Sequence, residues 1–430
     1  MTDSSIAAAA PIGKAVHAEA AGTAARNLLW LSGDKFVSIA LGLLVFALIA
    51  RHYGPEGAGQ FSYGVAMLQA TLGLALVCSS AAVLPRLCRL SPAAAASAVA
   101  NIFVSRIAAS VLAAGAVAVY AVIAIDDPVR RTVTLVMVAS VPLLEPFHAF
   151  SAYWLSRNRN RRPVLARGSG LLARLAVVAL ALWAGASPWI VALAWVAEAL
   201  VTAAMQAAGM RDVKPWRRLA AATSPARVRA YLRFGIRFAA GLWLSHLFLR
   251  VDRMWLAERM DPTAFGLYAT SMQLVDVWLQ VASLLAGSMA PAFLYNALRR
   301  SSALRDHWRT LAMLAGLGLA GVAGAALLGP VLLSRVFGEP FAAGQGYLLA
   351  GFAAAVLFFI DQFVHVSITA NALPGLLALK WGAACVVAIA TLKLAMPLIG
   401  AYAGPLGLAL GLVVSWLVVA AERLRRAPSN

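Results

Sequence analysis

The stretch that decides the fold is Ala50-Arg-His-Tyr-Gly-Pro-Glu-Gly-Ala-Gly-Gln-Phe61, which lies between two long apolar runs. Proline lacks an amide hydrogen and fixes φ, so the Gly54-Pro55 step ends the first run as a helix. Gly57 and Gly59 then permit a tight reversal into the second run. The stretch therefore predicts two membrane helices, roughly at 28–50 and 61–84, joined by a turn.

The same turn returns in the second half of the chain. Three residues and an aromatic position recur 207 positions later, so that Ala50, Pro55, Gly59 and Phe61 are matched by Ala257, Pro262, Gly266 and Tyr268. Downstream, Pro85 and Pro291 lie 206 positions apart, and each is expected to close the helix that follows its turn. With the similar helix pattern around them, these matches predict an internal duplication.

Composition places the chain among polytopic membrane proteins. Of the 430 residues, 62% are hydrophobic and 12% are charged, against about 25% charged residues in soluble domains. Residues 1–26 lack the order of a signal peptide and are interpreted as a loosely ordered cytoplasmic tail. Twelve spanning helices are expected, roughly at 28–50, 61–84, 98–125, 131–155, 169–186, 188–209, 230–256, 264–296, 308–329, 344–370, 374–397 and 401–424.

The distribution of basic residues tests this count. With the N-terminus inside, the inside segments hold 23 of the Lys and Arg residues and the outside segments hold 6. Cytoplasmic loops carry such an excess in membrane proteins, so the net charge of +19 needs no nucleic-acid partner. Both termini are expected in the cytoplasm, as is a basic linker at 211–229. This linker separates a six-helix bundle at 27–210 from a second one at 230–424. Residues 425–430 are expected to form a second cytoplasmic tail. Because six is even, the two repeats should be parallel.

The motifs of membrane-bound enzymes and pumps are missing from the sequence. There is no Gly-Lys-Ser/Thr nucleotide loop, no His-Glu-x-x-His, no Cys-x-x-Cys and no Gly-x-Ser-x-Gly. Cys78, Cys88 and Cys385 are scattered and form no metal-binding spacing. We therefore expect binding and movement of a substrate, with no catalysis, no cofactor and no metal.

Polar residues within the apolar runs are the candidates for that binding, because each is costly in a membrane unless it faces a cavity or a partner. The helix at 230–256 is the most polar, with His246, Arg250 and Arg253 at i, i+4 and i+7 on one face. In the tenth helix, Asp361 and His365 lie one turn apart and could share a proton. The plainer alternative is a buried clamp between the tenth and eleventh helices.

Two motifs and the layout carry a family resemblance. Asn27-Leu-Leu-Trp30, the turn Ala50-Arg51-x-x-Gly54-Pro55-x-x-x-Gly59-x-Phe61 and the twelve-helix duplication resemble the polysaccharide-unit (O-antigen type) flippases. These belong to the multidrug/oligosaccharidyl-lipid/polysaccharide exporter superfamily. The resemblance implies two six-helix bundles around a V-shaped cavity lined mainly by helices 1, 2, 7 and 8. The second turn departs from the first, with Asp261 for Gly54 and Glu258 for Arg51.

The resemblance also implies a cargo, undecaprenyl-diphosphate-linked oligosaccharide, moved to the outer leaflet of a bacterial inner membrane. A diphosphate in a low-dielectric cavity needs fixed cations, and arginine suits phosphate oxygens. The expected substrate-binding residues are Lys35, Arg51, Gln69, His246, Arg250, Arg253 and Gln273. Residues for charge balance or cation coupling are Asp34, Glu145, Asp276, Asp361 and His365. Expected partners are the lipid-linked oligosaccharide, membrane lipids and polysaccharide assembly proteins.

Other functions remain open on this basis. A multidrug antiporter of the same superfamily would need an acidic, aromatic cavity for organic cations, and the basic bias argues against it. A major-facilitator transporter usually carries Gly-x-x-x-Asp-Arg/Lys-x-Gly between helices 2 and 3, which residues 85–92 do not match. A membrane scaffold for a glycosyltransferase complex is a third possibility, and no motif favours it.

Overall fold

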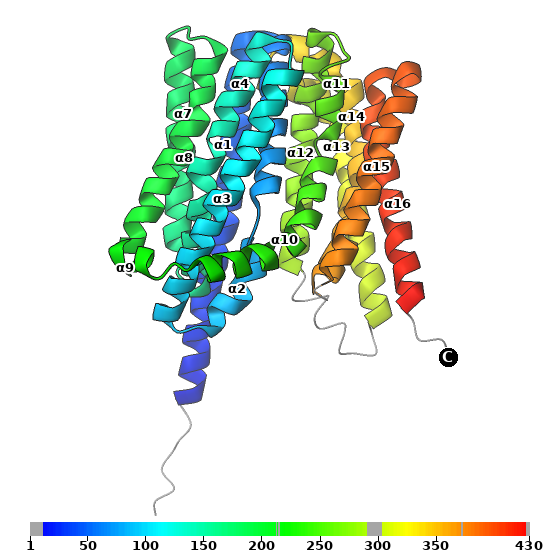
Figure 1. Cartoon of the computed structure of the whole chain (residues 1–430). Coiled ribbons are helices and arrows are strands. Elements are labelled where there is room, and N and C mark those ends of the chain that lie inside the picture. Colours follow the sequence, from blue (N-terminus) through cyan, green and yellow to red (C-terminus); the bar gives the residue numbers. More distant parts are fainter. Residues whose placement is uncertain (1–11, 212, 214–215, 290–302, 371–372, 427–430) are drawn as a thin grey trace, which may run out of the picture.

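The computed structural model describes residues 12–211, 213, 216–289, 303–370 and 373–426, which are almost entirely helical (Figure 1). The first half contains α1 (Ile12–Ala75), α2 (Ser80–Arg89), α3 (Pro92–Ala124), α4 (Pro128–Ala139), α5 (Val141–Leu144), η1 (Glu145–Phe147), α6 (His148–Ser156), α7 (Arg161–Trp183) and α8 (Pro188–Arg211). The short α9 (Trp216–Ala221) leads to the second half. That half contains α10 (Pro225–Phe248), α11 (Val251–Leu256), α12 (Pro262–Met289), α13 (Ala303–Phe337), η3 (Glu339–Gly344), α14 (Gln345–Ala370), α15 (Pro374–Ile399), η4 (Gly400–Tyr402) and α16 (Ala403–Arg426).

The predicted reversal lies within α1, which is two helices joined at Gly54. Gly54 has φ 68° and ψ −169°, a backbone conformation that only glycine adopts readily. Figure 1 shows the first part of α1 crossing the molecule and the second part returning beside α3. At the equivalent position of the second half, Asp261 instead caps α12, because its Oδ2 accepts hydrogen bonds from the amides of Thr263 (3.0 Å) and Ala264 (3.1 Å).

Two boundary predictions at the start of the chain were wrong. The first helix begins at Ile12, so residues 12–26 are helical and do not form a loosely ordered tail. The second helix ends at Ala75 and not near residue 84, because Cys78 takes a positive φ of 59° and the chain restarts as α2. Pro85 lies inside α2 and closes no membrane helix. Its counterpart Pro291 falls outside the described residues.

The expected architecture of about twelve membrane helices is confirmed. Eight stretches of the described residues are long and apolar enough to span a membrane. Two of them hold a helix pair, since Gly33–Ala75 contains the Gly54 reversal and Pro374–Arg425 contains η4. The segment α10–α11 and helix α12 complete the set. Residues 216–221 and 225–229, which were predicted as linker, form α9 and the first turn of α10.

Small residues set the packing within each half, as is usual between membrane helices. In the α15–α16 hairpin, a Cβ on Gly411 would lie 2.9 Å from the carbonyl oxygen of Ala384, and one on Gly407 would lie 3.2 Å from that of Ala388. The two helices therefore approach through their backbones, which places their larger side chains toward neighbouring helices and lipid.

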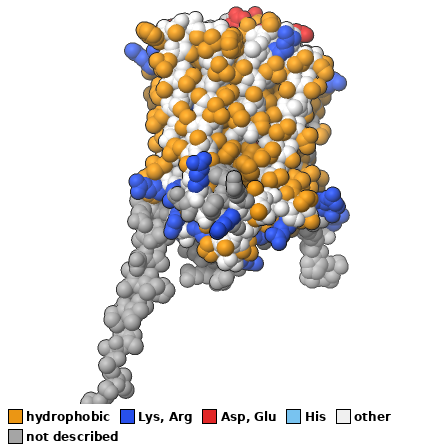
Figure 2. Space-filling model, turned by 60° about the vertical axis from the view of Figure 1, so that its left-hand side comes forward, with side chains coloured by type: hydrophobic (Ala, Val, Ile, Leu, Met, Phe, Trp, Pro, Cys, Tyr) orange, Lys and Arg blue, Asp and Glu red, His pale blue; other side chains and the backbone are white. Residues whose placement is uncertain are grey.

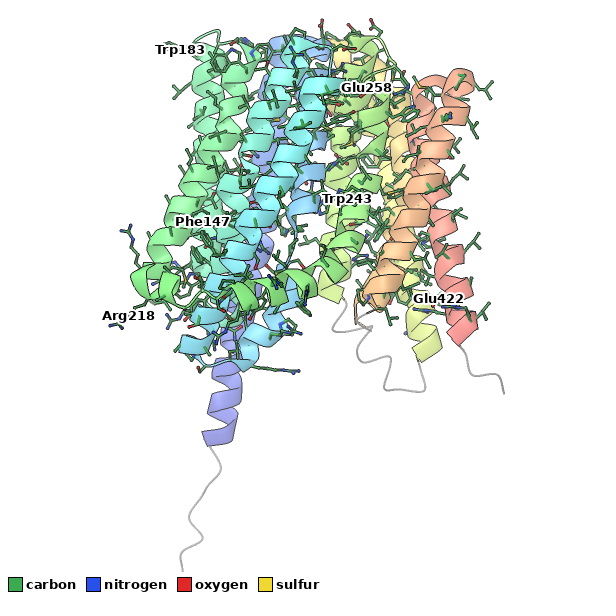
Figure 3. All side chains as sticks on the ribbon, viewed as in Figure 1. Phe147, Trp183, Arg218, Trp243, Glu258 and Glu422 are labelled. Atoms are coloured by element: carbon green, nitrogen blue, oxygen red, sulfur yellow. The ribbon has the colours of Figure 1, made fainter. Side chains whose placement is uncertain are left out.

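The two ends of the molecule differ in charge. Figure 2 shows a hydrophobic band whose Lys and Arg side chains gather mostly at one end, with Asp and Glu visible at the opposite end. The start of α1 and the end of α16 both lie at the first end (Figure 1). We call this the basic end and its opposite the far end. In Figure 3, Arg218 lies toward the basic end, and Glu258 lies toward the far end.

Candidate functional site: the cavity between the two halves

The far end is closed by contact between the two repeated turns. A Cβ on Gly59 would lie 3.3 Å from Cα of Gly266, and one on Gly266 would lie 1.8 Å from the carbonyl oxygen of Pro55. Gly59 and Gly266 are the matched glycines of the two repeats. Only residues without a side chain allow the α1 and α12 backbones to meet this closely.

Polar contacts reinforce the same closure. Arg51, predicted to bind substrate, donates from Nε to the carbonyl oxygen of Val336 (2.9 Å) and from Nη2 to that of Arg335. Tyr120 Oη donates to Glu258 Oε1 at 3.1 Å. Arg51 and Tyr120 belong to the first half, and their partners belong to the second. In this conformation Arg51 thus joins the two halves at the far end and does not face the cavity.

A cavity of about 390 Å³ lies below this closure. Its walls come from α1, the segments α5 and α6, and helices α7 and α8 of the first half, and it is completed by Gln273 and Gln280 of α12. The predicted residues Gln69 and Gln273 both line it. They come from α1 and α12, the helices that meet at the closed far end, so the structure brings this pair of predicted residues together.

The cavity was expected to be lined mainly by helices 1, 2, 7 and 8. The seventh helix, α10, contributes no residue to its lining. Instead α10 packs directly on the second part of α1. A Cβ on Gly73 would lie 3.2 Å from His246 Cβ and 3.3 Å from Trp243 Cα. The predicted site residue His246 is therefore in the α1–α10 contact and not on the cavity wall.

Two arginines of α7 supply positive charge to the cavity, and neither was among the predicted site residues, since Arg167 was assigned to a cytoplasmic loop. Arg167 and Arg174 line it seven residues apart, on one helix face. Arg167 Nη1 lies 3.2 Å from Asp34 Oδ2, and Arg174 Nη1 lies 2.8 Å from Glu198 Oε2. The i, i+7 spacing that drew attention to His246 and Arg253 could also have identified this pair.

Lys35 and Asp34 lie on the first part of α1. Lys35 is exposed, and Asp34 is half-buried beside Arg167. The cavity-lining Ser38 follows one turn later, and its hydroxyl donates to the Asp34 carbonyl oxygen at 2.6 Å. The predicted residues Lys35 and Asp34 are thus placed one turn from the cavity lining, on the side nearer the basic end.

Glu145 forms a buried charge cluster behind the cavity wall. Its carboxylate lies 2.7 Å from Arg106 Nη1 and 2.8 Å from His148 Nδ1. Pro142 and Pro146 break the predicted 131–155 helix here into α4, α5, η1 and α6. His148 lines the cavity with 38% of its side chain exposed, whereas Glu145 is 2% exposed. Glu145 thus reaches the cavity only through His148.

The predicted single-face stack of His246, Arg250 and Arg253 was wrong. Helix α10 ends at Phe248 and α11 begins at Val251, so Arg250 lies in the break, with φ −131° and ψ −11°. Arg250 and Arg253 both donate to Asp276 Oδ2, the latter at 2.8 Å.

These arginines do not face the large cavity. Arg253 and Asp276 line a separate space of about 30 Å³ inside the second half, between α11, α12, α15 and α16. Asp252 lines it too and accepts a hydrogen bond from Tyr268 at 2.6 Å. In this conformation Arg250 and Arg253 pair with Asp276. The arginines that line the large cavity therefore both come from α7.

Asp361 pairs with a residue that the sequence reasoning missed. Lys380 Nζ of α15 lies 2.7 Å from the Asp361 carboxylate, and both side chains are fully buried. Trp416 Nε1 of α16 donates to Asp361 Oδ1 at 2.8 Å. The His365 ring packs beside Trp381, 6.1 Å between centroids, and the sharing of a proton by Asp361 and His365 stays a prediction. The geometry matches the alternative, a clamp between the tenth and eleventh helices.

Comparison with known proteins identifies the family. Residues 24–295 match the family model described as polysaccharide biosynthesis protein. The chain belongs to this family. A search of curated proteins finds no match. The polysaccharide biosynthesis family is the one that the Ala50–Phe61 turn suggested, and the resemblance is confirmed.

Solved structures share the fold of this polysaccharide biosynthesis protein. The lipid II flippase MurJ in an inward closed conformation superposes with a TM-score of 0.66 at 14% identity, covering 91% of this chain and 86% of MurJ. An inward-facing multidrug resistance MATE family transporter of the MOP superfamily gives 0.64 at 14% identity, covering 91% and 96%. A MOP superfamily transporter from Pyrococcus furiosus gives 0.59 at 14% identity, covering 92% and 95%. The two-repeat transporter fold is thus confirmed.

Proposed function

We propose that the protein is a flippase that moves undecaprenyl-diphosphate-linked oligosaccharide from the cytoplasmic to the outer leaflet of a bacterial inner membrane. The observation that carries the proposal is the lining of the 390 Å³ cavity, where guanidinium and amide side chains gather between two apolar bundles. The membership in a polysaccharide biosynthesis family supports it.

The diphosphate is assigned to Arg167 and Arg174. Guanidinium groups bind phosphate oxygens through paired, charge-assisted hydrogen bonds. Each arginine now contacts a carboxylate, Asp34 or Glu198, at the edge of the same cavity. An entering diphosphate would take over these donors, and Lys35 lies one turn away to balance the displaced carboxylates. Arg250 and Arg253 would join only in a conformation that releases them from Asp276.

The sugars are assigned to the amide side chains. Gln69, Gln273 and Gln280 each offer both a donor and an acceptor, which matches the hydroxyl groups of a glycan. Because they come from both halves, the bound sugar would contact both bundles at once. The polyprenyl chain needs no polar site, since it can remain in the bilayer while the head group crosses.

The orientation of the protein in the membrane is inferred from the charge of the basic end. We assign that end, with both termini, to the cytoplasm, because cytoplasmic segments carry the excess of Lys and Arg. The far-end closure at Gly59 and Gly266 would then seal the outer side. The described conformation corresponds to the step that precedes release to the outer leaflet.

Transport by purified protein tests the proposal. Proteoliposomes would carry a fluorescent polyprenyl-diphosphate oligosaccharide, and movement would be followed by an impermeant quencher. We expect Arg174→Gln to slow translocation at least about tenfold. A factor of ten corresponds to roughly 1.4 kcal/mol, the loss expected when a charge-assisted contact is removed. Arg159→Gln, an exposed arginine of the α6–α7 loop, is the control with the same charge change. Equal rates for the two variants would contradict the assignment.

A second candidate is an organic-cation antiporter. Glu198 and Trp195 line the same cavity, and Arg174 lies over the Trp195 ring at 5.2 Å, where another cation could be received. The same proteoliposomes loaded with ethidium distinguish the two functions. Ethidium transport that is lost in Glu198→Gln, without translocation of the lipid-linked glycan, would replace the flippase by the antiporter.

A further inference from the structure

A second cavity, of about 520 Å³, opens at the basic end between α2, α3 and α10. It is separate from the cavity between the two halves and shares none of its lining residues. Figure 1 shows the first turns of α10 lying across the lower ends of the first-half helices, close to α2 and α3. The cavity therefore lies where the hydrophobic band of the molecule gives way to its basic end.

The charge of this second cavity is positive and unbalanced. Arg86 of α2 and Arg227 of α10 line it, and no Asp or Glu does. Neither arginine has a carboxylate partner among the residues that the structure describes. The Arg86 guanidinium is held over the Phe234 ring of α10 at 3.7 Å, which fixes the side chain without neutralising it. The two guanidinium groups thus line one cavity that contains no carboxylate side chain to balance their charge.

The polar and apolar groups of the cavity are separated. Ser97 and Tyr231 supply hydroxyl groups beside the two arginines. Leu90, Ala94 and Ala98 form an apolar wall. A free anion would need only the first set. An anion attached to a hydrocarbon chain would use both.

Hydrogen bonds of Asn101 hold together two of the segments around the cavity. Asn101 of α3 donates to the carbonyl oxygen of Ala222 (3.1 Å) and accepts from the amide of Ser224 (2.9 Å). These hydrogen bonds tie the segment before α10, the helix that carries Arg227, to α3. The contact of Arg86 with Phe234 links α2 to the same α10. Both arginines are therefore held at α10.

We propose that this cavity binds the phosphate head group of an anionic phospholipid from the leaflet at the basic end. The phosphate would lie between Arg86 and Arg227, within reach of the hydroxyl groups of Ser97 and Tyr231. One acyl chain would follow Leu90, Ala94 and Ala98 into the bilayer. The bound lipid would bridge α2 and α3 of the first half to α10 of the second. This inference does not depend on which substrate the cavity between the two halves carries.

The experiment measures thermal unfolding of the purified full-length protein in a neutral detergent. Phosphatidylglycerol, phosphatidylcholine and inorganic phosphate are added separately to the wild type and to two double variants. The test variant is Arg86→Gln with Arg227→Gln. The control variant is Arg89→Gln with Arg229→Gln, which removes the same charge from the same two helices at exposed positions outside the cavity.

We expect phosphatidylglycerol to raise the unfolding temperature of the wild type and the control, and the test variant to lose most of that increase. Phosphatidylcholine and inorganic phosphate should give much smaller increases. An equal response of both double variants would show diffuse attraction to the basic end and would overturn the site. An equal response to inorganic phosphate and phosphatidylglycerol would identify a free-anion site and would overturn the lipid assignment.

If the test variant unfolds too early to be compared, mass spectrometry of the intact protein in detergent gives a second measurement. The wild type should retain phosphatidylglycerol in preference to phosphatidylcholine, and Arg227→Gln alone should reduce that preference. Arg227 is exposed and makes no hydrogen bond or ion pair with the residues that the structure describes, so this variant is expected to fold. Unchanged retention in Arg227→Gln would overturn the proposal.

Discussion

At the scale of single residues, the two repeated turns are built by different chemistry. Gly54 reverses the chain through a backbone conformation reserved for glycine. Asp261, its counterpart 207 residues later, instead caps the helix that follows. The sequence predicted both turns from Gly-Pro and Asp-Pro, since these pairs act locally. It did not predict that only the first would require a positive φ.

This difference makes Gly54 the more sensitive position. Gly54→Ala should lower the free energy of unfolding by about 1–3 kcal/mol, because a side chain at this φ and ψ is strained. Gly168→Ala is the control, since Gly168 is helical and a Cβ there meets no atom within 4 Å. It should leave stability unchanged or raise it by about 0.5–1 kcal/mol. Thermal unfolding in detergent measures both, and equal effects would contradict the explanation.

At the scale of helices, the polar residues within the membrane divide into clamps and cavity groups. Arg250, Arg253 and Asp276 join α11 to α12, and Asp361 joins α14 to α15 and α16. Sequence periodicity shows which residues share a face of one helix. It does not show which face of another helix they meet. For this reason Lys380 was missed as the partner of Asp361.

The buried pair gives a prediction at this scale. Asp361→Asn should destabilise the protein by about 3–5 kcal/mol, because it leaves the Lys380 charge buried without a partner. Adding Lys380→Met should restore much of that loss, since both charges are then removed. Thermal unfolding of the two variants measures this. A stable Asp361→Asn protein that loses only its response to a proton gradient would instead support a coupling role.

The same distinction explains how far the site itself could be predicted. Gln69 and Gln273 were identified because they interrupt apolar runs, and both line the cavity. Arg250 and Arg253 interrupt such runs equally, yet they face away from it. The break between α10 and α11 that redirects them contains neither proline nor glycine. Tertiary contacts set that break, so local sequence signals did not reveal it.

At the scale of the whole molecule, transport would require the far end to open, and the contact between Gly59 and Gly266 must then separate. Gly266→Ala should favour the open form, because a Cβ there would overlap the Pro55 carbonyl group. A cysteine introduced at the buried Ala58, in a background lacking the exposed Cys88, reports the opening by its reaction with an impermeant thiol reagent.

We expect faster labelling in Gly266→Ala than in the parent protein. Gly115→Ala is the control, since its Cβ would meet no atom within 4 Å. Unchanged labelling in Gly266→Ala, with the protein folded, would show that the closure adapts without opening.

The orientation of the molecule gives the last prediction. Single cysteines at the exposed positions Ala226 and Thr263 should react from opposite sides of the membrane in intact cells and inverted vesicles. The one at 226 should react only from the cytoplasm, because it lies at the basic end. Labelling of both from the same side would contradict the arrangement of the second half.

The meeting of Gly59 with Gly266 has an evolutionary consequence. Equivalent positions touch each other only on a symmetry axis, as in an isologous homodimer. A half-length ancestor with this turn would have paired with its own copy here, and each substitution would have altered both partners together. Fusion of two such copies into one gene would remove that constraint. The two turns could then diverge, as Gly54 and Asp261 do here, and a symmetric dimer would become a protein with two unequal halves.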